Sequence, residues 1–221
     1  MILFGLLPLD AQATDISLNI GTDIPYQLHI GSTIDRKKLR VSLRSGILFG
    51  PYSQMTIGLV ELLGTPEVYV SILESAYQFG SMNALALQYA IGNKQNWYIG
   101  PEMRFDYLMA SDTGSELIEA VLGQDLSPKI GAQRDQELLV DLGLMMYAVG
   151  LRFTRQIPFT KKHALLVELS IYKHYQTKSS LYINEETPEN LDTMLNDLLW
   201  KDVFLPYGYL GGFGMTYHHT F

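Results

Sequence analysis

The sequence contains no cysteine among its 221 residues. A disulfide scaffold, a cysteine-ligated zinc site and a thiol nucleophile are therefore excluded. The chain also lacks any continuous apolar stretch of the roughly 18 residues that a membrane-spanning helix needs, although 47% of its residues are hydrophobic. These absences argue against a helical membrane protein, and a mean hydropathy of +0.06 argues against a disordered chain.

Basic residues are scarce relative to acidic ones, which gives a formal net charge of −7. No cluster of Lys and Arg is interleaved with aromatic residues on one face, so we expect no nucleic-acid partner. Among the aromatic residues Tyr dominates, with 14 copies against 9 Phe and 2 Trp. Tyrosine is enriched both in β-strands and at membrane interfaces.

The N-terminus has the features of the end of a secretory signal. Ile2 to Leu9 is a short apolar run, and Ala11-Gln12-Ala13 has the small-x-small form of a cleavage site. We therefore expect residues 1–13 to be a signal-peptide remnant and residues 14–221 to form a single domain. A buried N-terminal strand is the alternative.

Hydrophobic residues alternate with polar ones in segments of about ten residues, the pattern of barrel strands. Leu39, Val41 and Leu43, for example, are separated by polar side chains. Residues 138–153 are apolar on both parities, so the pattern leaves their facing open. We predict about eight strands, at residues 15–22, 26–35, 38–49, 81–92, 96–110, 137–154, 163–178 and 207–221.

Short polar turns alternate with long segments near residues 51–80, 111–136 and 179–206. Outer-membrane barrels have this asymmetry, with short periplasmic turns and longer outer loops. The predicted fold is therefore all-β: an antiparallel up-and-down transmembrane β-barrel with its long loops outside.

The long segments carry signals for amphipathic helices. Thr65-Pro66-Glu67 and Thr187-Pro188-Glu189 each place a capping residue, a proline and an acid at a helix start. Thr113 to Glu116 fits a capping box. We predict a helix in each long segment, and Met55 to Leu63 adds a candidate for a fourth.

The polar parity of the strands carries charges of both signs. Such residues can pair inside a narrow barrel, whereas an Arg or Lys at a lipid-facing midplane would cost about 2–4 kcal/mol. We predict a polar network in the lumen formed by Arg40, Arg44, Glu102, Arg104, Asp106, Glu168 and His174. A soluble barrel with these charges facing water stays open as an alternative.

The last strand places aromatic and apolar residues on one parity and ends in an aromatic: Phe213, Met215, Tyr217 and Phe221. This resembles the C-terminal strand of small bacterial outer-membrane β-barrel proteins. Gly21-Thr22-Asp23-Ile24-Pro25 and Gly50-Pro51-Tyr52 look like segments of uncharacterised members of that group. The resemblance implies recognition by the outer-membrane barrel assembly machinery, and contact with the lipid bilayer and lipopolysaccharide, but it implies no activity.

Aromatic residues near predicted strand ends are expected to form interface girdles. They are Trp97, Tyr26, Tyr209, Phe153 and Phe221.

Some small barrels act on lipids through a His, a Ser and an acid. His174, Ser170 and Glu168 share one face of a predicted strand, but their two-residue spacing is too wide for a row of direct hydrogen bonds. His29 is the other candidate for such a lipid-modifying enzyme. We favour a structural network over catalysis and expect no cofactor and no metal ion.

The apolar faces of the loop helices are the strongest functional lead, because they must be buried somewhere. They could pack as a cap or dock a protein partner, and the best candidate surface comprises Leu191, Met194, Leu195, Leu198, Leu199 and Trp200. The sequence thus favours a surface barrel with a helical cap that serves structure or binding. A small channel or a carrier for apolar solutes is the alternative.

Overall fold

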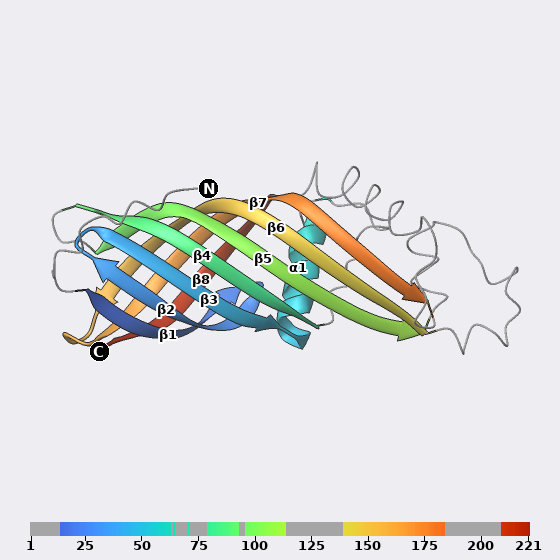
Figure 1. The fold of residues 1–221 in the computed structure, drawn as a ribbon, viewed down its shortest axis with the longest axis horizontal. Helices are drawn as coiled ribbons and strands as arrows, with labels where there is room; N and C mark the ends of the chain where they lie inside the picture. The colour runs from blue at the N-terminus through green and yellow to red at the C-terminus, as the bar shows by residue number, and fades with distance from the viewer. Residues whose placement is uncertain are drawn as a thin grey trace, which may run out of the picture.

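The computed structural model describes residues 14–62, 64, 70, 79–92, 96–113, 139–183 and 209–221. Eight antiparallel strands follow one another around a closed barrel, and β8 pairs with β1 to complete it (Figure 1). This confirms the predicted fold. The strands are β1 (Asp15–Ile24), β2 (Gln27–Arg36), β3 (Leu39–Leu48), β4 (Phe79–Ile91), β5 (Trp97–Thr113), β6 (Leu139–Pro158), β7 (His163–Ile183) and β8 (Tyr209–Thr220).

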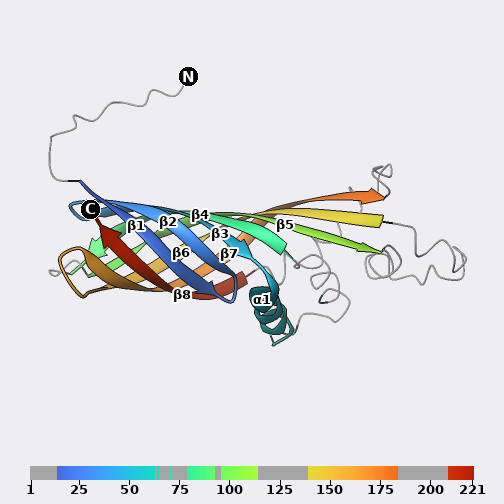
Figure 2. The ribbon, with the colours of Figure 1, turned by 90° about the horizontal axis from the view of Figure 1, so that it is seen from below.

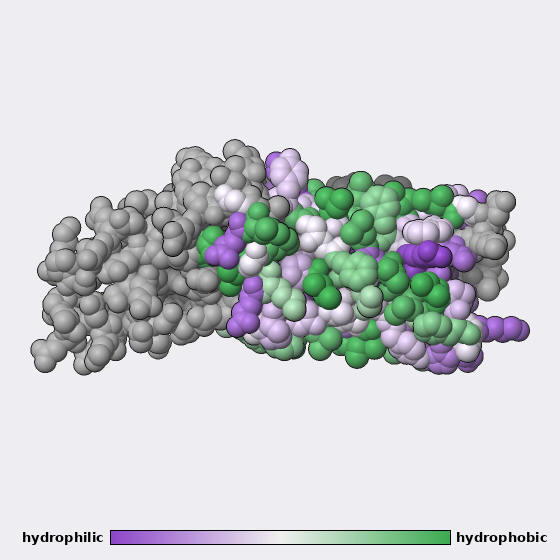
Figure 3. All heavy atoms as spheres, turned by 180° about the vertical axis from the view of Figure 1, so that it is seen from behind, coloured by the Kyte–Doolittle hydropathy of each residue, from purple (hydrophilic) through white to green (hydrophobic). Residues whose placement is uncertain are grey.

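The alternation in sequence becomes an alternation between the outside and the inside of the barrel. Ile30 and Leu43 point outward and are 65% and 57% exposed, whereas Arg40 and Arg44 point inward and are almost fully buried. Figure 3 shows apolar side chains spread over the barrel wall, with hydrophilic ones toward both of its ends. An apolar exterior around a charged interior is the reverse of a soluble barrel and is the arrangement that a bilayer requires.

In β6 the structure shows which side chains of the segment that is apolar on both parities point into the barrel and which point outward. Leu144 and Met146 point inward and are buried, while Val149 and Leu151 point outward and are exposed. The interior therefore accepts apolar side chains at this level, which is why the alternation disappears from the sequence.

The strands differ in length, so one end of the barrel is uneven. β1, β2 and β3 have 10 residues each, whereas β6 and β7 have 20 and 21 and extend beyond them (Figure 2). The β1–β8 pairing stops at Ile24 and Phe213. Residues 209–212 of β8 therefore continue past the end of β1. The opposite end carries the short turns and the C-terminus.

Helix α1 (Gly50–Leu62) follows β3 at the uneven end of the barrel (Figures 1 and 2). It begins before the helix expected at Met55 to Leu63. Among the residues that the structure describes, no helix is long and apolar enough to cross a membrane. The helices expected after Thr65, Thr113 and Thr187 lie outside the described residues, as does the expected signal remnant at residues 1–13.

Candidate functional site: the charged barrel interior

A group of buried ion pairs, here called the central network, crosses the middle of the lumen. Arg44 donates a hydrogen bond to Glu168, and Arg152 donates one to Glu102. Arg152 also lies 3.4 Å from Oε1 of Glu168, which links the two pairs. The four side chains come from β3, β5, β6 and β7, so the ion pairs connect walls that are distant in sequence.

Asp23 is the fifth member of the central network. Its carboxylate lies 3.6 Å from Nη1 of Arg44, 3.9 Å from Nη2 of Arg152 and 3.6 Å from Nδ1 of His29. Nε2 of Gln27 donates to it over 3.0 Å. Each carboxylate of the network therefore faces a cation, which offsets the cost of removing the charges from water.

A second group of contacts closes the lumen near the short turns. Arg40 donates to both carboxylate oxygens of Asp35, over 2.7 and 2.8 Å, and to Oε1 of Gln156 over 2.6 Å. Its guanidinium lies 3.7 Å from the centroid of the Tyr98 ring. A bidentate ion pair stacked on an aromatic ring is a favourable way to bury a guanidinium.

Aromatic rings hold a further arginine toward the uneven end. Arg104 lies over the rings of Tyr26 and Tyr172, with distances of 5.1 and 4.4 Å to their centroids. Its Nε is 3.9 Å from Asp106, a longer separation than in the central network. His174 lies 4.0 Å from the other oxygen of Asp106. Charge at this level is stabilised largely by π faces.

Tyr26 is not part of an interface girdle, contrary to the sequence prediction. It is fully buried at the turn between β1 and β2, and its hydroxyl donates to the carbonyl of Gly211 over 2.8 Å. Gly211 belongs to the part of β8 that β1 does not reach, and Tyr26 therefore supplies a bond there that a neighbouring strand would otherwise make. Trp97, Tyr209, Phe153 and Phe221 do face outward and are exposed.

Helix α1 is attached to the β1–β2 turn by hydroxyl groups. Oγ1 of Thr56 donates to the carbonyl of Pro25 over 3.1 Å, and the hydroxyls of Thr22 and Tyr52 are 2.7 Å apart. Between the helix and the outward faces of β7 and β8 lies a groove of about 570 Å³, lined by residues that include Met55, Leu59, Leu62, Leu169, Ile171 and Phe213.

Gly214 explains how the central network fits into so narrow a lumen. A Cβ at this position would lie 2.6 Å from Oδ1 of Asp23 and 3.2 Å from Cβ of Glu168. A Cβ at Gly212, also on the inward face, would meet Ser170 and Tyr26 at 3.0 Å, so the inward glycines of the last strand allow close packing.

The seven residues predicted to form a lumen network all point into the barrel and are buried: Arg40, Arg44, Glu102, Arg104, Asp106, Glu168 and His174. The structure brings Arg44 to Glu168, and Arg104 and His174 to Asp106. It does not pair Arg40 with the others.

Sequence reasoning missed Arg152, Asp23 and His29 as members of the interior. Arg152 shares its parity with Gly150 and Thr154, so strict period-two alternation around it could have identified it. Asp23 was assigned to the first turn, but β1 extends to Ile24 and places it inside.

A hydroxyl, an imidazole and two carboxylates do meet in the lumen, but they are poorly arranged for catalysis. Oγ1 of Thr216 donates to Oε2 of Glu168 over 2.9 Å and lies 3.2 Å from Nε2 of His29. A hydroxyl whose proton is directed at a carboxylate cannot give it to the imidazole, and Thr216 is 0% exposed. His174, Ser170 and Glu168 do not form a catalytic set either, because Ser170 is directed at the carbonyl of Gly212.

Asp23, His29 and Glu168 also offer metal-ligand atoms within 4.8 Å of one another. Arg44 and Arg152 contact both carboxylates, however. Two guanidiniums already neutralise these acids and would repel a divalent cation, so the donor set does not fit a metal ion.

The C-terminal residues Phe213, Met215, Tyr217 and Phe221 all face outward and are exposed. The candidate docking residues, from Leu191 to Trp200, lie outside the described residues.

No protein-family model and no curated protein sequence matches the chain. Solved structures with a similar fold include CarO2 and CarO of Acinetobacter baumannii. They have 10% and 12% identity and TM-scores of 0.42 and 0.40, and the matches cover 95% and 94% of this chain and 100% and 97% of theirs. A major outer membrane protein from Thermus thermophilus matches with 11% identity and a TM-score of 0.47, over 95% of this chain and 100% of that one. Similarity at this level carries no information about function.

Proposed function

We propose that this protein is a non-conducting β-barrel of the bacterial outer membrane, in which the lumen is an ionic plug and binding takes place at the long-loop end. The observation that carries the proposal is a pair of contacts that link opposite walls: the ion pair of Arg44 with Glu168 and, nearer the short turns, the hydrogen bond from Arg40 to Gln156. An ion would have to separate buried charge pairs to pass, which is costly in a lumen of this size.

Planar-bilayer recordings test the plug. We expect the unaltered protein to insert without steady current and the double variant Arg44→Ala, Glu168→Ala to open a conductance, because it removes two side chains that cross the lumen. As a control, Leu43→Ala changes a neighbouring outward residue and should leave the barrel closed. Steady currents through the unaltered protein would overturn the proposal.

The long loops are the proposed binding end, with lipopolysaccharide around them and a protein partner at the apolar stripe that includes Leu195 and Leu198. These segments hold much of the sequence outside the strands, and the stripe has helical spacing. Protease added to intact cells should cleave within residues 184–208. Cleavage only after the outer membrane is broken would show that these segments face the periplasm and would contradict the proposed orientation.

We further propose that the last strand, with Phe213, Met215, Tyr217 and Phe221, is the segment that the barrel assembly machinery binds. Deletion of Phe221 should slow folding into the membrane in cells. Spontaneous folding of the purified chain into vesicles should change little, which separates recognition from barrel stability.

A carrier for apolar solutes is the second candidate, and the groove beside α1 is the observation that favours it. The groove lies where β8 continues past β1, and Tyr26 stands between it and the lumen. If solutes pass laterally here, Tyr26→Ala should increase uptake of a fluorescent fatty acid into liposomes. No increase in a correctly folded variant would end this alternative.

A further inference from the structure

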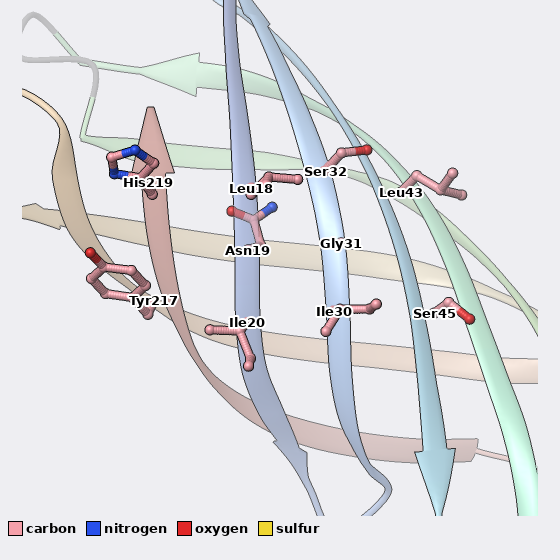
Figure 4. Close-up of a pocket in the computed structure, with 10 residues that line it drawn as sticks. All are labelled: Leu18, Asn19, Ile20, Ile30, Gly31, Ser32, Leu43, Ser45, Tyr217 and His219. Carbon is pink, nitrogen blue, oxygen red and sulfur yellow. The ribbon is translucent and has the colours of Figure 1, made fainter. Parts of the chain in front are cut away.

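The outward face of β8, β1, β2 and β3 carries a second hollow, on the part of the wall nearest the short turns. Its volume is about 670 Å³, within the range of ligand pockets. Figure 4 shows two rows of side chains around it. One row comprises His219, Leu18, Ser32 and Leu43, and the other comprises Tyr217, Ile20, Ile30 and Ser45.

Two small side chains create the hollow. Ser32 stands between Leu18 and Leu43 in the strand register, and Ser45 stands beside Ile30. Ser32 is shorter than Leu18 and Leu43, and Ser45 is shorter than Ile30, so the wall is recessed between these large apolar residues. The leucines and isoleucines that surround the recess make it a site for hydrocarbon.

The hollow runs from the rim of the barrel toward the middle of the apolar band. His219 is the penultimate residue of β8, whereas Leu43, on the same row, lies in the middle of β3. Three strand spacings separate the two ends of the row, or about 14 Å measured across the strands. Because the strands of a barrel are tilted, the His219 end lies at the rim, at the depth of lipid headgroups, and the Leu43 end lies further along the wall, among acyl chains.

The rim end is polar, and two imidazoles and a phenol lie together there. Nδ1 of His163 lies 2.5 Å from the hydroxyl of Tyr217 and 3.3 Å from Nδ1 of His219. The turn before His163 carries Lys161 and Lys162, and the backbone carbonyl of Lys162 accepts a hydrogen bond from Thr220, which ties this turn to the end of β8.

Basic residues flank the rim end of the hollow on both sides. Lys161 and Lys162 lie on the β7 side, Arg36 ends β2, and Lys37 and Lys38 occupy the turn between β2 and β3. The acids at this rim are Asp15, at the start of β1, and Asp35, which is already bonded to Arg40. An apolar groove that begins among cations matches an amphiphile with a negatively charged head.

We propose that this hollow binds one anionic phospholipid of the periplasmic leaflet, with its phosphate beside His163, His219 and Lys162 and an acyl chain along Leu18, Ile30 and Leu43. The inference goes beyond the proposed function and rests on it only for the membrane location. It does not depend on whether the lumen conducts.

Native mass spectrometry of the full chain, released from nanodiscs that contain equal phosphatidylglycerol and phosphatidylcholine, tests the site. The expected result is a single retained phosphatidylglycerol, favoured over phosphatidylcholine by about tenfold, which corresponds to about 1.4 kcal/mol. Equal retention of the two lipids, or retention of neither, would overturn the proposal.

Two sets of variants test the apolar end and the charged end of the site separately. Ser32→Leu with Ser45→Leu fills the hollow and should abolish retention, and Lys161→Gln with Lys162→Gln should remove the preference for phosphatidylglycerol. Ser81→Leu is the matched control, since Ser81 faces outward on β4, away from the hollow. Heat-modifiable gel migration confirms that each variant is folded. If the filled variant retained the lipid as well as Ser81→Leu does, the site would be elsewhere.

Discussion

The middle of the lumen and its uneven end both bury arginine, but they do so by different means. In the central network Arg44 and Arg152 contact carboxylates directly, and Glu168 is shared between them. Arg104, toward the uneven end, lies over two tyrosine rings with its nearest carboxylate 3.9 Å away. The direct ion pair of Arg44 and Glu168 connects opposite walls, whereas Arg104 is held mainly by contacts with aromatic rings.

The two kinds of contact divide the lumen into a centre held by ion pairs and an uneven end held by aromatic rings. The aromatic level adjoins α1 and the end of β8 that β1 does not cover, where the second groove lies. A barrel that binds at its long-loop end would use the second region and depend on the first for stability.

Of all the substitutions, removal of Glu168 should reduce the stability of the central network most strongly. Glu168→Leu leaves two buried guanidiniums short of a carboxylate, and we expect the free energy of unfolding to fall by about 3–5 kcal/mol. Urea unfolding in phospholipid vesicles measures it. Glu168→Gln keeps the shape and an acceptor oxygen and should lose less. An unchanged midpoint for Glu168→Leu would show that the network is dispensable.

Filling the space at Gly214 tests whether the centre is packed as closely as the contacts indicate. Gly214→Val should cost about 1–3 kcal/mol, because its side chain would meet Asp23 and Glu168. Gly211→Val, on the outward face of the same strand, is the control and should be tolerated, since its nearest contact is 3.7 Å away. Equal effects at both positions would argue against close packing inside.

At the uneven end the expected losses are smaller. Tyr26→Phe removes the hydroxyl that binds the Gly211 carbonyl and should lower stability by about 1 kcal/mol. It should also speed amide hydrogen exchange in residues 209–212. Tyr26→Leu removes the ring beneath Arg104 as well and should lose more than Tyr26→Phe. Identical values for the two would show that the ring contributes nothing.

The smallest effect is expected at the rim. Arg155 is exposed and lies 4.9 Å from the centroid of the Trp97 ring, so Arg155→Ala should cost less than about 1 kcal/mol. The same deletion inside, Arg40→Ala, leaves Asp35 without its bidentate partner and should cost clearly more. The difference between the two unfolding midpoints measures what burial adds to an arginine contact.

Much of the architecture could be predicted because period-two alternation is a local property of the chain. It assigned Arg40, Arg44 and Glu168 to the inside and Leu43 to the outside. The alternation fails where both faces accept apolar residues, as at Leu144 and Met146 of β6. The facing of the whole segment was therefore left open, and Arg152 was missed although the residues beside it alternate. The prediction also failed at Tyr26, since a tyrosine at a strand end has the pattern of a girdle residue until its ring is found inside.

The sequence by itself determined the number of strands, which face of each is polar, and the long loops at one end, because each of these follows from residues close together in the chain. Only the tertiary structure decided which charges meet. Arg44 and Glu168 are 124 residues apart and touch because closure of the barrel brings β3 opposite β7. The recess on the outer wall has the same origin, since Ser32 and Ser45 become one hollow only through the register of three adjacent strands.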